Sequence, residues 1–417
     1  MYVDRRYRPK STDLICEFTF RPNNTKPEYV AEQIAAESSV GTWTDITTET
    51  AYTKKIAAKV FYIKRNGQYY NIKVAYPFDL FEPHNVPQIM SSIAGNIFGM
   101  KIIKELRLED INIPSALMKS FKGPRFGIAG VRKVLNVKKR PLLGTIVKPK
   151  LGLNTKDHAK VAYEAWVGGC DIVKDDENLS NQKFNSFENR VIKTLDAADR
   201  AKSETGERKA YMPNVTAETE EMIRRAEFIK EHGGTYAMID ILTAGWSGLQ
   251  TLRDADIGLI IHAHRAGHAA FTRGRHGISM LTIAKLARLI GVDQIHIGTV
   301  VGKMVGGKEV HEIEEEIEKN IIKGRGHILS EKWINIKPVF AVCSGGLHPG
   351  HVPSLIKMLG NDIIIQMGGG IHGHPNGTID GARAARQALD AVMKGISLKE
   401  YAKTHNELAM AGKKWGI

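Results

Sequence analysis

Eight short apolar segments alternate with longer segments of helical spacing over about 270 residues of this chain, the usual size of a (β/α)8 barrel. The apolar segments end at 145–148, 172–174, 211–214, 237–240, 260–264, 294–296, 339–342 and 363–366. Such alternation predicts parallel strands joined by helices. A doubly wound open sheet is the alternative, but eight evenly spaced units favour closure. We therefore predict an α/β fold with a C-terminal (β/α)8 TIM barrel.

The first 125 residues have a different pattern. Their strand-like segments alternate with helical spacing, and Asn66-Gly67 is a strong hairpin signal. The strand-like segments are 14–20, 56–63, 69–75 and 102–108, and the helical ones begin at Lys26 and cover 86–98. A segment rich in glycine and proline, 121–127, marks a boundary. We expect an N-terminal α+β (ferredoxin-like) domain over 1–125 and the barrel over 126–417.

The chain is basic, with a net charge of +14 and a pI of about 9.4. Nucleic-acid binding is one interpretation, but acidic residues are interleaved throughout, and phosphorylated small molecules would use the same positive field. No run of about 18 apolar residues predicts a membrane span, and no apolar segment behind the N-terminus predicts a signal peptide. The three distant cysteines form no disulfide framework. We expect a cytoplasmic protein that binds neither nucleic acid nor membrane.

Four charges follow the apolar run 170–173. They are Lys174, Asp175, Asp176 and Glu177. If the strand continues, Lys174 and Asp176 share one side of it, and two carboxylates suit a hard cation such as Mg²⁺. A salt-bridged rim is the simpler interpretation of one such cluster. Polar groups recur, however, at the other strand ends, where a barrel has its active site.

Lysines and histidines follow two more strands. Lys148 and Lys150 flank a proline that ends the first strand. After the fifth strand, His262 and His264 could both be metal ligands, or one could be a core histidine and the other a site histidine, which we prefer. Arg265 beside them suggests a phosphate clamp.

Glycines mark the ends of the last three strands. Lys303 lies among glycines in 298–307, the composition of a lid or of an idle surface loop. The triplets 344–346 and 368–370 suit phosphate, which barrels often bind after these strands. The residues thus indicate an enzyme for a phosphorylated, oxygen-rich substrate. Its chemistry would be proton abstraction next to a carbonyl, with a metal stabilising the enediolate.

Several long motifs, in order, resemble the large subunit of ribulose-1,5-bisphosphate carboxylase/oxygenase (RuBisCO) over almost the whole chain. The segment 144–153 resembles the first barrel motif of that family, and 168–177 resembles its activation motif. The segments 37–44 and 95–99 resemble its N-terminal motifs. The compact N-terminal segment and the residue sequence of 276–280 are most similar to those of archaeal form III enzymes.

The resemblance implies a function for each matching residue. Lys174 would be carbamylated by an activating CO₂ and would hold Mg²⁺ with Asp176 and Glu177. The residues with catalytic roles would be Lys148, Lys174, His264 and Lys303. The residues that bind substrate would be Glu37, Thr42, Trp43, Asn96, Lys150, Arg265, His296, Ser344, Gly346, Gly368 and Gly369.

The implied reaction is enolisation and carboxylation of ribulose 1,5-bisphosphate to two 3-phosphoglycerate, with O₂ competing with CO₂. Glu37, Thr42, Trp43 and Asn96 would complete the site of a neighbouring subunit, so a homodimer or a ring of dimers is expected, without a small subunit. The main alternative is a RuBisCO-like enolase or isomerase of sulfur salvage. A metal-dependent amidohydrolase is a second alternative, but it would need its His-x-His pair after the first strand. Here the pair His262 and His264 follows the fifth strand.

Two positions depart from the pattern of the family. Val305 stands where a glutamate is usual after the loop lysine, and Ile371-His372 replaces the more common Thr-Leu after the third glycine. Neither change removes an expected catalytic group.

Overall fold

The computed structural model describes residues 2–44, 46–301 and 307–416, and the chain forms two compact units. The N-terminal unit consists of Met1–Gly123, Gly267–Gly291 and Lys319–Ile336. The barrel unit consists of Pro124–Ala266, Val292–Glu318 and Lys337–Ile417. Among the described residues, no helix is long and apolar enough to cross a membrane.

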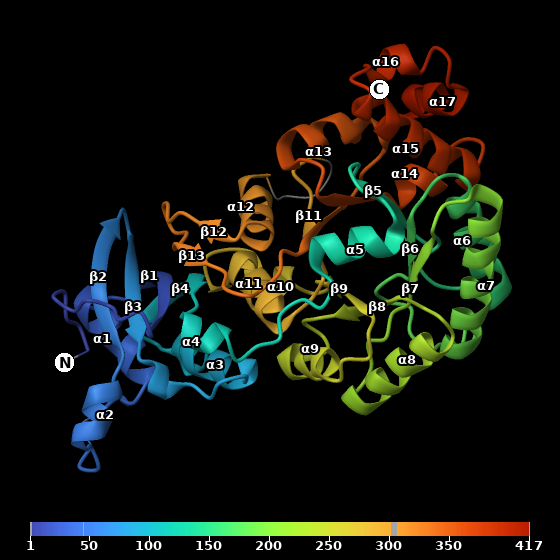
Figure 1. Cartoon of the computed structure of the whole chain (residues 1–417). Helices are drawn as coiled ribbons and strands as arrows, with labels where there is room; N and C mark the ends of the chain where they lie inside the picture. Colours follow the sequence, from blue (N-terminus) through green and yellow to red (C-terminus); the bar gives the residue numbers. More distant parts are fainter. Residues whose placement is uncertain (1, 45, 302–306, 417) are drawn as a thin grey trace. The chain divides into compact units, whose positions relative to one another are not determined.

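The barrel unit contains a parallel sheet of eight strands at the predicted positions (Figure 1). They are β5 (Leu142–Ile146), β6 (Ile172–Lys174), β7 (Ala210–Met212), β8 (Tyr236–Asp240), β9 (Ile260–His264), β11 (Gln294–Gly298), β14 (Phe340–Ser344) and β15 (Ile363–Gln366). The spatial order is β7-β6-β5-β15-β14-β11-β9-β8. A parallel bridge between Asn214 and Met238 joins the two ends. The predicted barrel, rather than an open sheet, is thereby confirmed.

The strands are apolar because both of their faces are covered. A cluster that includes Leu142, Ile172, Met212 and Met238 fills the interior.

The helices of the unit are α5 (Gly127–Leu135), α6 (Thr155–Val167), α7 (Phe187–Thr205), α8 (Thr219–Glu231), α9 (Gly245–Asp254), α12 (Gly307–Glu318), α13 (Val352–Leu359), α14 (Gly369–His372), α15 (Thr378–Met393), α16 (Leu398–Tyr401) and α17 (Asn406–Trp415). Local caps set their starts: the Asn154 side chain accepts a hydrogen bond from Asp157 N at 3.0 Å, at the start of α6.

The N-terminal unit contains a five-stranded sheet in the order β10-β4-β1-β3-β2. Its elements are β1 (Leu14–Pro22), α1 (Pro27–Glu37), α2 (Ala51–Ile56), β2 (Lys59–Asn66), β3 (Tyr69–Tyr76), η1 (Phe78–Leu80), α3 (Val86–Ile93), η2 (Asn96–Gly99), β4 (Ile103–Asn112) and α4 (Ser115–Met118). Strands β1 to β4 with α1 and α3 give the predicted ferredoxin-like pattern. Two boundaries were wrong: Ile56 ends a helix, and the helical segment 86–98 is divided into α3 and η2.

Later segments of the chain complete this N-terminal unit. They are α10 (Ala269–Thr272), β10 (Gly277–Ile278), α11 (Met280–Ile290), β12 (Ile321–Ile322) and β13 (Glu331–Lys332). The predicted helix at 283–289 is present as α11, but every one of its residues is buried, so it has no solvent face. Its Lys285 Nζ donates to Asp110 Oδ1 at 2.8 Å and lies 3.9 Å from Glu331, so the buried ammonium joins three segments of the unit.

A buried carboxyl in the N-terminal sheet leads to a pH prediction. Burial raises the pKa of Glu17 to about 8, although Lys73 lies 3.7 Å away. Because the folded state then holds the proton more tightly than the unfolded state, stability falls as pH rises from about 4.5 to about 8. We expect Glu17→Gln to remove this loss, a gain on the order of a few kcal/mol above pH 8. Unfolding midpoints measured from pH 5 to pH 9 check it; parallel curves for the two proteins would contradict it.

Candidate active site

Two lysines that follow β5 meet the two carboxylates that follow β6. Lys148 Nζ donates to Asp176 Oδ2 at 2.5 Å, and Lys150 Nζ lies 3.7 Å from Glu177 Oε1. Burial would raise the pKa of Asp176, but the hydrogen bond and the charge of Lys148 lower it. The structure therefore brings together four residues that the sequence singled out at the ends of neighbouring strands.

Lys174 is the last residue of β6, and its side chain is enclosed in the barrel. The residue is 1 % exposed, and its Nζ donates to Asp175 O at 2.8 Å and contacts Met238 Sδ at 3.3 Å. Among the described residues, no carboxylate lies within ion-pair distance of it. Burial lowers the pKa of the Lys174 ammonium, while Glu177 and Asp176 oppose that shift. Burial thus favours the neutral amine more than water would, and a neutral amine is a nucleophile.

The donor set is consistent with a hard cation only if Lys174 is modified. No group of three His, Cys, Asp or Glu side chains suited to a metal occurs in the part of the chain that the structure describes. Asp176 and Glu177 supply two carboxylates, and Mg²⁺ prefers oxygen ligands. An ammonium cannot ligate a cation, whereas a carbamate on Lys174 would add the missing oxygen. The residues present thus suit Mg²⁺ together with a carbamylated lysine.

His264, at the end of β9, is oriented by a carboxylate that the sequence reasoning did not assign to the site. His264 Nδ1 lies 2.7 Å from Asp240 Oδ1, and its Nε2 lies 3.8 Å from Glu177 Oε2. Because a carboxylate accepts, Nδ1 carries the proton and Nε2 is left to exchange protons with a bound molecule. Asp240 is the last residue of β8, and its position at a strand end was the feature of the sequence that could have identified it as a site residue.

The other residues near the end of β9 have distinct environments. His262 is fully buried and its pKa is well below the ordinary value because of burial, so it is the core histidine of the pair. Arg265 Nε donates to His296 Nδ1 at 3.1 Å. Burial lowers the pKa of Arg265 to about 10, so its guanidinium keeps its charge at neutral pH. A Cβ at Gly298 would collide with that guanidinium, so glycine is needed where β11 ends.

The glycines after β14 and β15 lie at the same end of the barrel. Ser344 ends β14, and Gly346 follows with a φ of +72°. Gly368 precedes α14, and a Cβ at this position would lie 3.2 Å from Lys148 Cε. This close approach puts the backbone of the glycine triplet beside the lysine that contacts Asp176.

The remaining predicted residues belong to the N-terminal unit or lie outside the described residues. Glu37, Thr42, Trp43 and Asn96 belong to the N-terminal unit, and Trp43 is 80 % exposed. Lys303 and Val305 lie outside the described residues.

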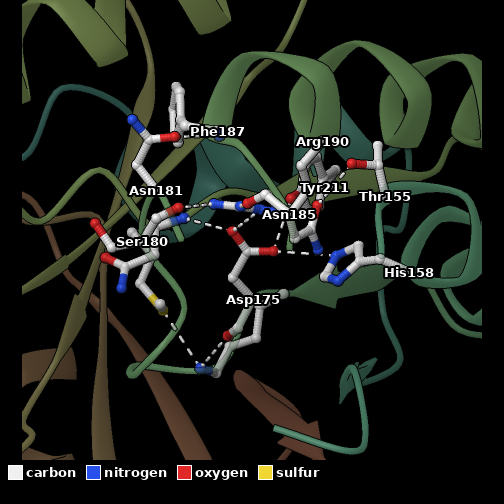
Figure 2. A network of polar contacts seen from close by, with 12 residues as sticks. Thr155, His158, Asp175, Ser180, Asn181, Asn185, Phe187, Arg190 and Tyr211 are labelled. Carbon is white, nitrogen blue, oxygen red and sulfur yellow. Dashed lines mark hydrogen bonds and ion pairs between the residues drawn. The ribbon is translucent and has the colours of Figure 1, made fainter. Parts of the chain in front are cut away.

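Asp175 points away from the site into a buried polar network, which the sequence reasoning missed (Figure 2). Its carboxylate accepts from Arg190 Nε at 3.1 Å, from Tyr211 OH at 2.7 Å and from Asn214 N at 3.0 Å. His158 Nε2 lies 3.2 Å away. Burial alone would raise the pKa of Asp175, but Arg190 and its other partners hold it well below its usual range. The residue between two candidate metal ligands is thus fixed in the wall of the barrel.

Comparisons with known proteins decide the family. The chain matches the N-terminal domain of the ribulose bisphosphate carboxylase large chain over residues 1–117 and its catalytic domain over residues 127–415. The chain belongs to the RuBisCO large-chain family. The resemblance stated from the sequence is therefore confirmed.

Archaeal relatives and solved structures resemble this chain along its whole length. Ribulose bisphosphate carboxylase of Methanocaldococcus jannaschii is 53 % identical, with 99 % of each chain covered. Dimeric archaeal Rubisco from Hyperthermus butylicus has a TM-score of 0.95 at 47 % identity and covers 100 % of this chain and 98 % of its own. Octameric Rubisco from Pyrococcus horikoshii has a TM-score of 0.94 at 48 % identity, with 100 % and 96 % covered. The relatives carry the name of a carbon–carbon lyase, which is the enzyme class expected from the sequence.

Proposed function

We propose that this protein is a ribulose-1,5-bisphosphate carboxylase/oxygenase that converts ribulose 1,5-bisphosphate and CO₂ to two 3-phosphoglycerate, with O₂ as the competing substrate. The single observation that carries the proposal is the buried Lys174 beside Asp176 and Glu177 in a chain of this family. An active enzyme of this kind needs a carbamate at that place, and burial, which lowers the pKa of the Lys174 ammonium, supports its formation there.

In this proposal, each proton transfer is carried out by a different residue of the chain. Lys174, once carbamylated, would remove the C3 proton of the substrate, and Lys148 would protonate the C2 carbanion after carbon–carbon cleavage. His264, oriented by Asp240, exchanges protons during hydration. Mg²⁺, held by Lys174, Asp176 and Glu177 when bound, supplies charge stabilisation for the enediolate.

The two substrate phosphates would be bound at opposite sides of the site. Arg265 and His296 would hold one phosphate, because the buried guanidinium donates to one ring nitrogen and keeps further N–H groups for an anion. Backbone N–H groups of Gly368 and Gly369 would hold the other, with Lys150 and Thr42 assisting. Ser344 and Gly346 would contact the sugar, and Lys303 would steady the incoming carboxylate.

We further propose that the working assembly is a homodimer or a ring of dimers. Glu37, Thr42, Trp43 and Asn96 would then act in the site of the neighbouring subunit. An exposed tryptophan costs free energy in a lone chain, and burial against a partner would offset that cost. The dimeric and octameric archaeal relatives support this assembly.

The test is incorporation of labelled CO₂ into 3-phosphoglycerate. The assay uses ribulose 1,5-bisphosphate, Mg²⁺ and anaerobic buffer after preincubation with bicarbonate. We expect acid-stable label in 3-phosphoglycerate, its loss when EDTA removes Mg²⁺, and its return when Mg²⁺ is added back, because two carboxylates and a carbamate hold the ion.

The main alternative gives a different result in the same assay. A RuBisCO-like enolase would exchange or isomerise its substrate without fixing label. A folded dimer that incorporates no label would therefore overturn the proposal and favour that alternative.

A further inference from the structure

His372, at the end of α14, is held on both sides of its ring. Its Nε2 lies 3.0 Å from Ile146 O and 3.0 Å from Thr145 Oγ1. Its Nδ1 lies 3.1 Å from Thr378 Oγ1. The ring therefore contacts the end of β5 on one side and the first residue of α15 on the other.

The partners fix the direction of each hydrogen bond. The carbonyl oxygen of Ile146 can only accept, so we assign the ring proton to Nε2. Thr145 Oγ1 donates to Met367 O at 2.7 Å and can therefore accept from His372. The Thr378 hydroxyl then donates to Nδ1. Burial lowers the pKa of His372 to about 4, in accord with a neutral ring that has one proton to place.

This network joins the two segments that flank the glycine triplet. Ile146 precedes Lys148 by two residues, and Met367 immediately precedes Gly368. Strands β5 and β15 are paired at Gly144 and Gln366, just before both segments leave the sheet. His372 continues that connection beyond the last strand pair, where Gly368 approaches the Lys148 side chain.

We propose that His372 is a positioning residue that fixes the Gly368–Gly369 turn, and so a phosphate bound there, relative to Lys148. This inference rests on the proposed function for its assignment of a substrate phosphate to the turn. A leucine at this position could not make these hydrogen bonds.

The test compares three variants of the full-length protein. His372→Leu removes the brace, and His372→Gln retains an N–H that can donate to Ile146 O. Thr145→Val removes the hydroxyl that joins His372 to Met367 O, but leaves the hydrogen bonds of His372 to Ile146 and Thr378 in place. Binding of inorganic phosphate to the metal-free protein is measured by calorimetry, and KM and kcat for ribulose 1,5-bisphosphate by the labelled-CO₂ assay. Thermal midpoints report whether each variant is folded.

We expect His372→Leu to weaken phosphate binding and raise KM on the order of tenfold, with a smaller change in kcat, because small displacements at a binding site have large effects. His372→Gln should restore both values to within about threefold of the parent. Thr145→Val should also weaken phosphate binding. It therefore tests the brace even if His372→Leu does not fold.

Two results would overturn the inference. One is an unchanged phosphate affinity in His372→Leu, or in Thr145→Val if His372→Leu does not fold. The other is an equal loss in His372→Gln and His372→Leu, since a hydrogen-bond brace must be rescued by the donor. If the parent fixes no label but its phosphate affinity still depends on His372, the proposed function fails and the role of His372 in holding the turn stands.

Discussion

Lys174→Met is expected to reduce carboxylation roughly a thousandfold or more, because under the proposed function it removes both a base and a metal ligand. Methionine is a matched choice: the side chain is buried against Met238 Sδ, so an unbranched apolar chain should fit without a cavity. The measurements are label in 3-phosphoglycerate and the carbamate signal of protein incubated with ¹³C-bicarbonate. Both should disappear together.

Lys209→Met is the control for that experiment. The Lys209 side chain is also enclosed, and its Nζ lies 2.9 Å from Glu207, which Arg386 pairs with as well. Loss of Lys209 therefore leaves no unpaired carboxylate, and carboxylation should stay within about threefold of the parent, as expected away from the site. Carboxylation that survives in Lys174→Met at the level of this control would exclude Lys174 as the activating residue.

Asp175→Asn is expected to have the largest effect on stability, a loss of roughly 3–5 kcal/mol in the free energy of unfolding. The substitution keeps the shape of the side chain but leaves the fully buried guanidinium of Arg190 without its counter-charge. The denaturation midpoint, followed by circular dichroism, measures it.

The control is Glu400→Gln, which breaks an exposed ion pair with Lys403 in the barrel unit. Its cost should be less than about 1 kcal/mol, because water screens the pair and hydrates the remaining charge. Equal midpoints for Asp175→Asn and Glu400→Gln would show that the buried network does not stabilise the barrel.

The barrel could be predicted from the sequence because its signal is local. Each strand is an apolar run that ends in polar residues, and in a parallel barrel those ends meet on one face. Lys148 and Asp176 were therefore expected near each other, although 28 residues separate them. From the sequence we also preferred one core histidine and one site histidine for His262 and His264. Alternate residues of a strand share a face, and the two differ in burial because His264 is the last residue of β9 whereas His262 lies deeper in the strand.

The remaining features depend on partners far away in the sequence. Strand alternation predicts that Asp175 points away from the side shared by Lys174 and Asp176, but nothing local identifies Arg190 as its partner. The pairing of His264 with Asp240 joins two strands, and the pairing of Lys285 with Asp110 spans 175 residues. Helix α11 has helical spacing, but only the packed unit reveals that its charged residues are buried.

The three-part construction of the N-terminal unit has a consequence for synthesis on the ribosome. After Gly123 is made, the unit still lacks β10, which pairs with β4, and Lys285, which pairs with the buried Asp110. Its last segment ends at Ile336, which emerges roughly 10–40 s later at about 5–20 residues per second. Until β10 (Gly277–Ile278) emerges within that interval, the nascent chain has an open β4 edge, a surface prone to pair with other chains. On polysomes, where several such chains lie close together, this edge is the surface that we expect to pair wrongly.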